Sequence, residues 1–239
     1  MRLKVMFSHM SVQLMAAAVL AGAVIAFFTG PAWIWLLVPL GVLTQMLNEY
    51  SIHRFLFHLK APTKQWQFDL LYQVHYGHHD FPTNKELFFV PVWFAIPMLC
   101  MYFILLWLAL SFVTPLALPI AASVILVGGV GTFLFYEWFH MTAHMNVPKV
   151  WVERHVTTLH NQHHFRDFSK WFHVSPGGQI IDRVMGTAID REALKSQQRM
   201  EFIRTMGLSP DDPRLVSARL RFAGKYGLSE AEIERAAVV

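Results

Sequence analysis

Charged residues and cysteine are both scarce in this chain of 239 residues. Asp, Glu, Lys and Arg make up 15% of it, whereas hydrophobic residues make up 54%. That composition is too apolar for an ordinary soluble domain and indicates a membrane protein. The single cysteine, Cys100, excludes a disulfide within the chain and a cysteine-rich metal site. The formal net charge is only +4, and the basic residues form no stripe of the kind that binds nucleic acid.

Two long stretches, residues 5–47 and 87–136, contain no charged residue at all. The first is broken at Thr29-Gly30-Pro31 and the second at Thr114-Pro115, and both breaks are turn signals. Each half approaches the roughly 20 apolar residues that cross a bilayer. A cleaved signal peptide is the alternative for the first stretch, but its length and the second apolar half favour a helical hairpin. We therefore predict an all-α integral membrane protein with four transmembrane helices.

These stretches divide the chain into five predicted segments. Transmembrane hairpins occupy residues 1–48 and 87–136, more polar segments occupy residues 49–86 and 137–190, and a charged tail occupies residues 191–239. In the tail, Ser229 and Glu232 have the spacing of a helix capping box. Every Lys and Arg lies at the N-terminus, between the hairpins or after the second one. By the positive-inside rule, both termini and the polar segments are predicted to face the cytoplasm.

Histidine is abundant: the chain has 13, and ten of them lie in four clusters within the polar segments and at their borders. The clusters are His53 and His58; His75, His78 and His79; His140 and His144; and His160, His163 and His164. Neutral imidazole is a common ligand of iron, copper and zinc, and ten imidazoles are more than one ion can use. The pattern therefore predicts a two-metal site. In each triplet the spacing places all three imidazoles on one helix face, where they can converge on one point.

His53 and His58 do not fit this pattern, because residues five apart on a regular helix diverge by roughly 140°. Either they serve different metals or the helix is distorted there. Of the remaining histidines, His155 and His173 are candidates for positions near the metals, and His9 has no predicted role. Haem and structural zinc are competing uses of such histidines. Membrane haem typically takes single axial ligands from the spans, and a structural zinc site often includes cysteine ligands. Ligation by many imidazoles favours iron, with zinc possible in isolated protein, but does not identify the metal uniquely.

Carboxylates near the clusters are candidate partners of the ligands. A metal-bound imidazole usually donates its other N–H to a carboxylate or a carbonyl. Glu137 lies about one helical turn before His140, and Asp182 follows the last cluster. Together with His155 and His173, these residues are the predicted neighbours of the metal ligands.

The four clusters, taken in order, resemble the fatty acid hydroxylase superfamily of membrane di-metal enzymes. The resemblance runs from Asn48 to Thr187 and includes the closing segment that begins at Asp182. The first pair, with four residues between its histidines, most resembles the fatty acid 2-hydroxylase branch. The resemblance implies a four-span helical enzyme whose cytosolic, histidine-rich helical cap binds two iron ions through the ten clustered histidines.

The resemblance also implies a reaction in which O2, as co-substrate, supplies oxygen to a C–H bond of a fatty acyl chain, free or in a lipid. Eukaryotic 2-hydroxylases often carry a fused cytochrome-type donor domain, for which this chain has no room, so a separate electron-transfer partner is expected. Leu159, Trp171 and His173 depart from the 2-hydroxylase pattern, which bears on the substrate. The alternatives are a sterol or carotenoid hydroxylase or desaturase with the same centre, and a non-catalytic membrane metal-binding protein.

Overall fold

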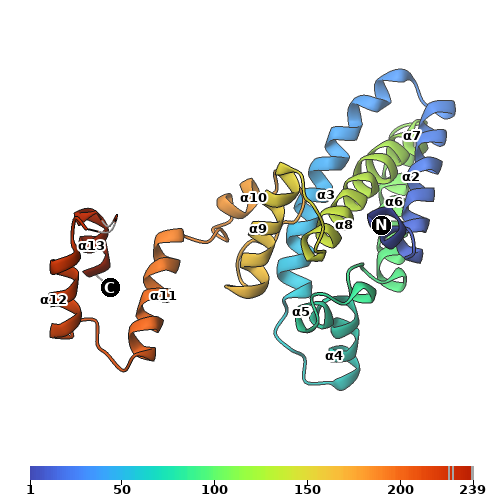
Figure 1. Ribbon diagram of the computed structural model, residues 1–239. Helices are drawn as coiled ribbons and strands as arrows, with labels where there is room; N and C mark the ends of the chain where they lie inside the picture. Colours follow the sequence, from blue (N-terminus) through green and yellow to red (C-terminus); the bar gives the residue numbers. More distant parts are fainter. Residues whose placement is uncertain (226, 228, 238–239) are drawn as a thin grey trace. The chain divides into compact units, whose positions relative to one another are not determined.

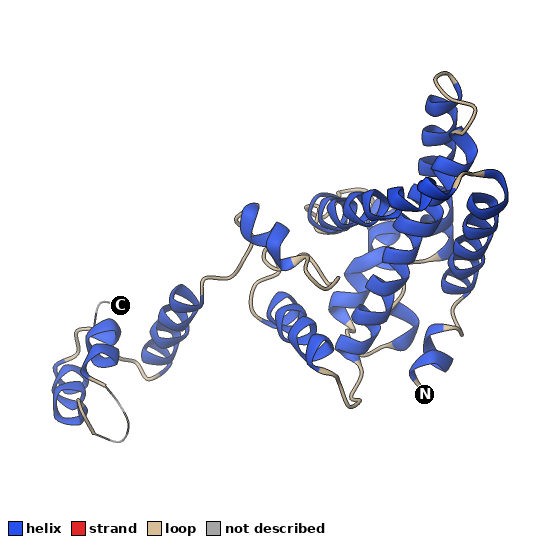
Figure 2. Cartoon of the chain, turned by 90° about the horizontal axis from the view of Figure 1, so that it is seen from above, coloured by secondary structure: helices blue, strands red, loops and turns tan. Residues whose placement is uncertain are grey.

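The computed structural model describes residues 1–225, 227 and 229–237, and every regular element in this part of the chain is a helix (Figure 2). The all-α prediction is therefore confirmed. Residues 226, 228, 238 and 239 of the predicted tail lie outside the described residues. The chain divides into two compact units, Met1–Ala188 and Ile189–Val239.

The first unit contains three helical segments that are long and apolar enough to cross a membrane. The short helix α1 (Arg2–Met6) precedes them in the chain. The segments are α2 (Met10–Thr29); Lys85–Ser111, with η4 (Lys85–Leu87) and α6 (Val92–Ser111); and Ala117–His144, with α7 (Ala117–Ala121), η5 (Ala122–Val130) and α8 (Gly131–His144). The protein is thus an integral membrane protein. Pro91 is the N-cap of α6, as expected of a residue that delays a helix start.

The second of the four predicted spans, in the latter half of the first hairpin, is not among these segments. Residues 32–52 form a short 3-10 helix, η1 (Ala32–Leu37), followed by α3 (Val38–Ile52). The turns predicted between the halves of each hairpin are confirmed, since α2 ends at Thr29, α6 ends at Ser111 and α7 starts at Ala117. The structure therefore supports three candidate spans and leaves the four-span count a prediction.

Helix α3 packs very closely against η5. A Cβ added at Gly41 would lie 2.0 Å from the carbonyl oxygen of Val124, and one added at Gly128 would lie 2.5 Å from that of Val38. Only glycine permits such an approach of two backbones. Figure 1 shows α3 and α8 running side by side. The close packing therefore fixes the first turns of α3, the helix that leads to His53, against the third span.

Six further helices complete the first unit: η2 (His53–Phe57), α4 (Gln65–Leu71), η3 (Tyr72–Tyr76), α5 (Gly77–Asp80), α9 (Trp151–Phe165) and α10 (Gln179–Val184). Of these, η2, η3, α5 and α9 carry clustered histidines. Figure 1 shows α4, α5 and α9 gathered around one end of α3 and α8. Both η2 and η3 are π-helices, a rare form that occurs frequently at functional sites.

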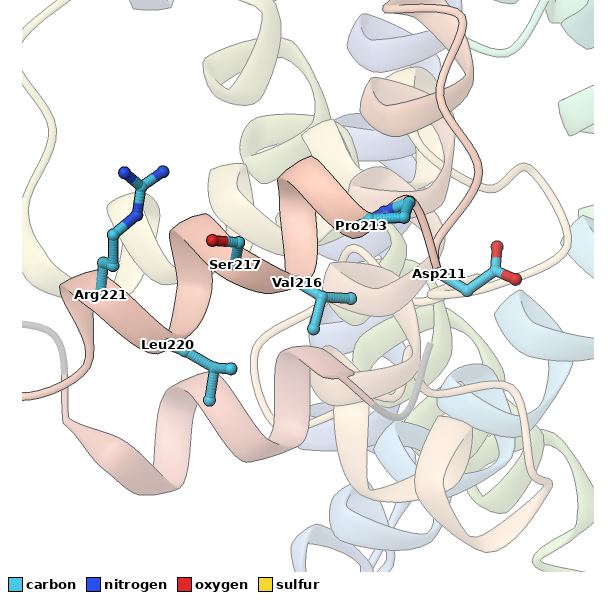
Figure 3. A pocket seen from close by; sticks show the side chains of 6 residues that line it. All are labelled: Asp211, Pro213, Val216, Ser217, Leu220 and Arg221. Atoms are coloured by element: carbon cyan, nitrogen blue, oxygen red, sulfur yellow. The ribbon is translucent and has the colours of Figure 1, made fainter.

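The second unit consists of α11 (Arg191–Thr205), α12 (Pro213–Phe222) and α13 (Glu230–Ala237). The predicted capping box is confirmed, because Ser229 N donates to Glu232 Oε2 at 3.0 Å and Glu232 N donates to Ser229 Oγ at 3.3 Å. A hollow of about 490 Å³ lies along α12 and is lined by residues such as Val216, Leu220 and Arg221 (Figure 3). The clustered histidines, from His53 to His164, all belong to the first unit.

Candidate metal centre

All ten clustered histidines come together in two groups of five. In each group, one ligand atom from every imidazole lies within 4.8 Å of the others. The first cluster is His53, His58, His75, His79 and His163. The second cluster is His78, His140, His144, His160 and His164. Each cluster could hold a metal ion, and the two adjoin, since the rings of His79 and His164 stack with centroids 4.1 Å apart.

Each histidine triplet divides between the two clusters, and the expectation that a triplet converges on one point is wrong. His75 and His79, four residues apart, enter the first cluster, whereas His78 enters the second. The triplet on α9 does the reverse: His163 enters the first cluster, and the pair four residues apart enters the second. Neighbouring residues on a helix point about 100° apart, so the closing pair of each triplet faces two different centres. The motif thus bridges both clusters.

A distorted helix explains the five-residue spacing of the first pair. His53 begins the π-helix η2, and His58 N donates to His53 O at 3.1 Å, a bond that spans five residues. This geometry brings positions five apart onto one side of the helix. The two Nε2 atoms consequently lie 3.2 Å apart in the same cluster. Of the two explanations offered by the sequence, helix distortion is the one observed.

The facing nitrogens of the first cluster carry lone pairs. His53 Nδ1–H donates to Phe172 O at 2.5 Å, and His163 Nδ1–H donates to Lys170 O at 2.6 Å. A neutral imidazole has one N–H, so each Nε2 is then a bare acceptor. Nε2 of His58 nevertheless lies 3.2 Å from that of His53 and 3.1 Å from that of His163. A single N–H on His58 Nε2 could satisfy only one of these two acceptors, so the arrangement fits a shared cation, because metal–nitrogen bonds of about 2.1 Å at right angles place two nitrogens about 3 Å apart.

Burial keeps these imidazoles neutral. It lowers the pKa of His53, His75, His78 and His160 well below its ordinary value, and neighbouring imidazoles lower it further. Burial and then the charge of His163 lower the pKa of His58 to about 3. Since metals bind the neutral form of imidazole, the clusters are ready to accept an ion without first losing protons.

The second cluster contains several buried ring nitrogens that have no hydrogen-bond partner among the described residues. Both nitrogens of His78 and of His164 are in this state, as is Nε2 of His140. Buried polar atoms are normally hydrogen-bonded, so a group of such orphans in one place points to a missing ligand. The nitrogens are well suited to a metal ion, and the donor set of the second cluster therefore fits one too.

Asp182 acts on the first cluster through the backbone. Its carboxylate accepts from Phe172 N at 2.9 Å and from His173 N at 3.1 Å, and it is fully buried. The carbonyl of Phe172 is the acceptor for His53. Between the carbonyls that bind His163 and His53 stands Trp171, which has a left-handed backbone with φ of 53°, rare for a residue other than glycine. Asp182 thus fixes a locally strained segment whose carbonyls orient two imidazoles.

Glu49 is a positioning residue that sequence reasoning missed. Its Oε1 accepts from Val174 N at 2.7 Å and Ser175 N at 3.0 Å, and Ser175 Oγ donates to Oε2. Burial raises the pKa of the Glu49 carboxyl. The signal that could have found it is its place one helical turn before His53, on the same face of the helix.

Glu137 supports the second cluster in the same indirect manner. Its Oε1 accepts from Val90 N at 3.1 Å, and nearby Phe88 O accepts from His140 Nδ1–H at 2.7 Å. The side chain is fully buried, and Oε2 has no hydrogen-bond partner in the part of the chain that the structure describes. Glu137 and Asp182 therefore each hold a backbone segment next to a cluster, and neither bonds to a clustered imidazole among the described residues.

The remaining histidines belong to neither cluster. His173 uses both ring nitrogens, Nδ1 with Asp182 Oδ2 at 3.1 Å and Nε2 with Met46 O at 2.9 Å. Burial lowers its pKa, but the hydrogen bond to Asp182 and the charge of Glu49 outweigh that effect and raise it. His155 stacks on Trp151, away from the clusters. His9 Nδ1 is bonded to the Ser11 hydroxyl at 2.8 Å.

A cavity of about 800 Å³ lies among the apolar helices and reaches the clusters. Its α6 wall extends from Phe94 to Leu110, a distance of roughly 24 Å along a helix. His53 of the first cluster lines the cavity. So does Tyr136, whose ring stacks on that of His140 with centroids 5.4 Å apart. The cavity is thus an elongated apolar space that the first cluster lines directly and the second approaches through the ring of Tyr136.

These features define an integral membrane protein with two adjoining all-histidine sites, each able to hold a metal ion, beside a long apolar cavity. The family model for fatty acid hydroxylase matches residues 38–187. The chain belongs to the fatty acid hydroxylase family, as its histidine pattern suggested.

Two named relatives with similar sequences are 2-hydroxylases. The chain is 34% identical over 155 residues to the dihydroceramide fatty acyl 2-hydroxylase FAH2 of Arabidopsis thaliana, covering 64% of this chain and 61% of the relative. It is 32% identical over 161 residues to the fatty acid 2-hydroxylase of Rattus norvegicus, covering 66% of this chain and 40% of the relative. The chain therefore spans less than two thirds of the length of these relatives.

One solved structure has a similar fold. Full-length scs7p, in which only the hydroxylase domain is visible, aligns with a TM-score of 0.63 and 23% identity over 75% of this chain and 65% of that one. At this level of identity the likeness concerns the fold alone. It agrees with the helical arrangement described above.

Proposed function

We propose that the protein is a membrane-bound monooxygenase that hydroxylates a fatty acyl chain near its carboxyl or amide end. The observation that carries this proposal is the position of the cavity, because a long apolar space is lined by His53 of the first cluster and by Tyr136, which stacks on His140 of the second. The related 2-hydroxylases of Arabidopsis thaliana and Rattus norvegicus support the same class of reaction.

The ten histidines would hold two metal ions, five ligands to each cluster. Two iron ions would supply activation of dioxygen and insertion of oxygen into a C–H bond, and zinc can occupy such sites in isolated protein. Asp182, Glu49 and Glu137 hold the backbone segments that orient the imidazoles. These carboxylates therefore determine how rigidly the donor atoms are placed.

The cavity would bind the acyl chain and exclude water from it. Its wall is mostly apolar, with side chains such as Met98, Leu106 and Ile125, so a hydrocarbon chain gains free energy by entering it. A chain lying along α6 presents only one end to His53. In the proposed orientation, the methyl end of the chain lies far from His53 and the carbons nearest the carbonyl lie beside it. This orientation favours oxygen insertion at carbon two.

We further propose four spans, with residues 31–47 as the fourth, and an active site on the cytoplasmic face. The one-sided distribution of Lys and Arg supports this topology. Reporter fusions at Gly30 and Pro115 should report the non-cytoplasmic side, and fusions at Lys85 and the C-terminus the cytoplasm. A cytoplasmic signal at Pro115 would overturn the four-span topology.

Oxygen insertion with release of water consumes two electrons, and none of the side chains in the clusters can supply them. We propose that a separate electron-transfer partner provides them on the cytoplasmic face. We therefore expect the activity of the purified protein to depend on an added reductase or electron carrier.

Incubation with a fatty acyl lipid under isotope-labelled dioxygen, with a reductant system, tests the proposed function. We expect one labelled oxygen atom at carbon two of the acyl chain, detected by mass spectrometry. Label in a sterol or carotenoid would show that the alternative substrate class is correct. Metal binding without any oxygenated product would favour a non-catalytic metal-binding protein.

A further inference from the structure

Two phenylalanine rings connect the histidine clusters with the protein surface. Phe165 ends α9 and Phe168 lies in the turn that follows, and the two residues are 62% and 54% exposed. The ring of Phe168 contacts those of His79 and His163 in the first cluster, with centroids 5.3 and 6.5 Å away. The ring of Phe165 lies 5.9 Å from that of His164 in the second cluster. Each cluster therefore has an exposed aromatic ring beside it.

These rings reach the clusters from a side that the cavity does not occupy. Within the described residues, the cavity is lined by neither phenylalanine and by neither of the ligands His79 and His164. His53 is the clustered histidine that lines it. An acyl chain in the cavity would therefore leave the two phenylalanines accessible to another partner.

Hydrogen bonds order the turn that presents the rings. Arg166 N and Asp167 N donate to Gln162 O at 2.9 and 3.0 Å. Asp167 Oδ1 accepts from Ser169 N at 2.9 Å and from Ser169 Oγ at 2.6 Å. Asp167 is also the one acidic residue between residues 165 and 170. The acid of the turn is thus engaged within the turn itself.

The charge that remains around the rings is positive. Arg166 is exposed, and within the described residues neither Arg166 nor Lys170 forms an ion pair. Lys170 Nζ donates to the carbonyl oxygen of Gly186 at 3.2 Å, which leaves its charge in place. The other acids between residues 151 and 186, Glu153 and Asp182, are buried. The surface therefore combines exposed aromatic rings with uncompensated cations.

Such a surface fits an electron-carrying protein. Hydroxylation of one C–H bond takes up O2, two electrons and two protons, and releases one water while the second oxygen atom enters the product. A one-electron carrier must therefore deliver an electron twice in each turnover. Electron-transfer encounters are weak and bury less than about 1,200 Å² in total, so a small patch suffices. Aromatic residues and arginine are enriched at protein interfaces, and complementary charge steers the encounter.

We propose that Phe165, Arg166, Phe168 and Lys170 form the docking surface for a small one-electron carrier protein with an acidic surface. This inference rests on the proposed hydroxylation and specifies the electron-transfer partner that the reaction needs. The cations attract the acidic carrier, and the two rings bring its redox group close to the imidazoles of both clusters.

Binding of a reduced plant-type ferredoxin, an acidic iron–sulfur protein, tests the proposal. It is titrated against the full-length, metal-loaded protein in uncharged lipid nanodiscs by calorimetry, at low and at high salt. We expect binding that weakens with salt, and a Kd at least about tenfold higher in Arg166→Glu, because like charges then face each other. Absence of binding at low salt would overturn the proposal.

A matched charge reversal locates the surface. Arg154→Glu changes the same charge on α9, roughly 17 Å along the helix from its end at Phe165. It should raise the Kd for ferredoxin less than about threefold. An equal rise in Arg154→Glu and Arg166→Glu would show that only the net charge of the protein matters, and would contradict the assignment of this surface.

The aromatic part of the surface is tested at Phe168. Phe168→Ala should raise the Kd for ferredoxin about tenfold, as expected of an aromatic anchor, while Phe168→Tyr, which keeps the ring, should bind as wild type does. Elemental analysis confirms that both variants hold two metal ions. Equal binding by Phe168→Ala and Phe168→Tyr would contradict a docking role of the ring.

Two other occupants of the surface give different results. If a second copy of this chain covers it, Phe168→Ala lowers the oligomeric mass measured by light scattering. If lipid covers it, a spin label at Phe165→Cys, in a Cys100→Ser background, is more accessible to oxygen than to a water-soluble nickel reagent. Either result would overturn the proposal.

The choice of reductant separates this proposal from the proposed function. If neither ferredoxin nor the small reductant dithionite yields an oxygenated lipid, acyl hydroxylation itself fails. If both yield product, the ratio of ferredoxin-driven to dithionite-driven turnover should fall at least about tenfold in Arg166→Glu at limiting ferredoxin. An unchanged ratio would mean that hydroxylation stands and that the docking surface lies elsewhere.

Discussion

The two histidine clusters have the same number of imidazoles but different supports. In the first cluster, His53 and His163 donate to carbonyls of residues 172 and 170, in a segment held by Asp182 and Glu49. In the second cluster, only His140 donates to a backbone carbonyl among the described residues, and several ring nitrogens have no partner. The first cluster thus depends on a clamped loop, whereas the second depends on the packing of α8 against α9.

This difference bears on how each cluster meets the substrate. His53 lines the cavity directly, whereas the second cluster reaches it through the ring of Tyr136, stacked on His140. A loop held by buried carboxylates fixes the cavity-facing imidazoles without filling the cavity itself. We infer that the positions of the imidazoles are held most precisely in the first cluster.

Removal of one ligand from each cluster should have the largest effect. His163→Ala and His78→Ala each delete an imidazole, from the first and the second cluster respectively. We expect each variant to lose metal and to lose hydroxylase activity by at least about 100-fold, because loss of a mere supporting group already costs 10–100-fold. Elemental analysis and product assays measure both. His155→Ala, which touches neither cluster, is the control and should behave as wild type.

Substitution of the supporting carboxylates should separate the clusters. Asp182→Asn perturbs three acceptor contacts near the first cluster and should weaken its metal affinity about 10–100-fold. Glu137→Gln alters one contact near the second cluster and should cost less. Metal titration followed by spectroscopy distinguishes the two. An equal loss at both clusters in Asp182→Asn would show that their supports are not independent.

The helix contact below the clusters supplies a further comparison. Gly128→Ala would push a methyl group against the backbone of α3 and should destabilise the protein by about 1–3 kcal/mol. Because His53 directly follows α3, metal affinity should decrease more at the first cluster than at the second. Gly131→Ala is the matched control, since nothing lies within 4 Å of a Cβ added there. A thermal shift of similar size in both variants would argue against the close contact.

The smallest effect concerns pH and the metal-free protein. Burial lowers the folded-state pKa of His58 to about 3 and that of His163 to about 4, whereas an unfolded histidine titrates near 6.5. The unfolded state therefore binds more protons below about pH 6.5, and stability should fall as the pH drops from there toward 3. Denaturant unfolding at several pH values checks this. Stability that rises on acidification would mean that these imidazoles are charged in the folded protein.

Sequence patterns predicted much of this architecture because the signals were local. Uncharged runs predicted membrane helices, and the spacing of ten histidines predicted a two-metal site before any contact was known. The alternation within each triplet was not predicted, because identical imidazoles carry no mark of which centre they face. Nor could the π-helix at His53 be distinguished from two separate ligand sets, since the choice depends on tertiary packing.

Long-range contacts account for what the sequence concealed. Glu49 reaches the backbone of residues 174–175, more than a hundred positions away, so nothing near it in the sequence indicates a partner. The role of Trp171 depends on a left-handed backbone that propensity alone argues against. The predicted second span at residues 31–47 has a different cause, which is local. An apolar run predicts a membrane helix but does not determine where that helix begins and ends.

The most direct test of the account is to locate the metals themselves. Anomalous X-ray diffraction from crystals of iron-loaded protein, recorded at the iron absorption edge, would reveal each bound ion independently of activity. We expect two separate peaks per chain, one surrounded by His53, His58, His75, His79 and His163 and the other by the second cluster. A single peak shared between the clusters, or a peak in only one of them at full loading, would contradict the two-metal centre.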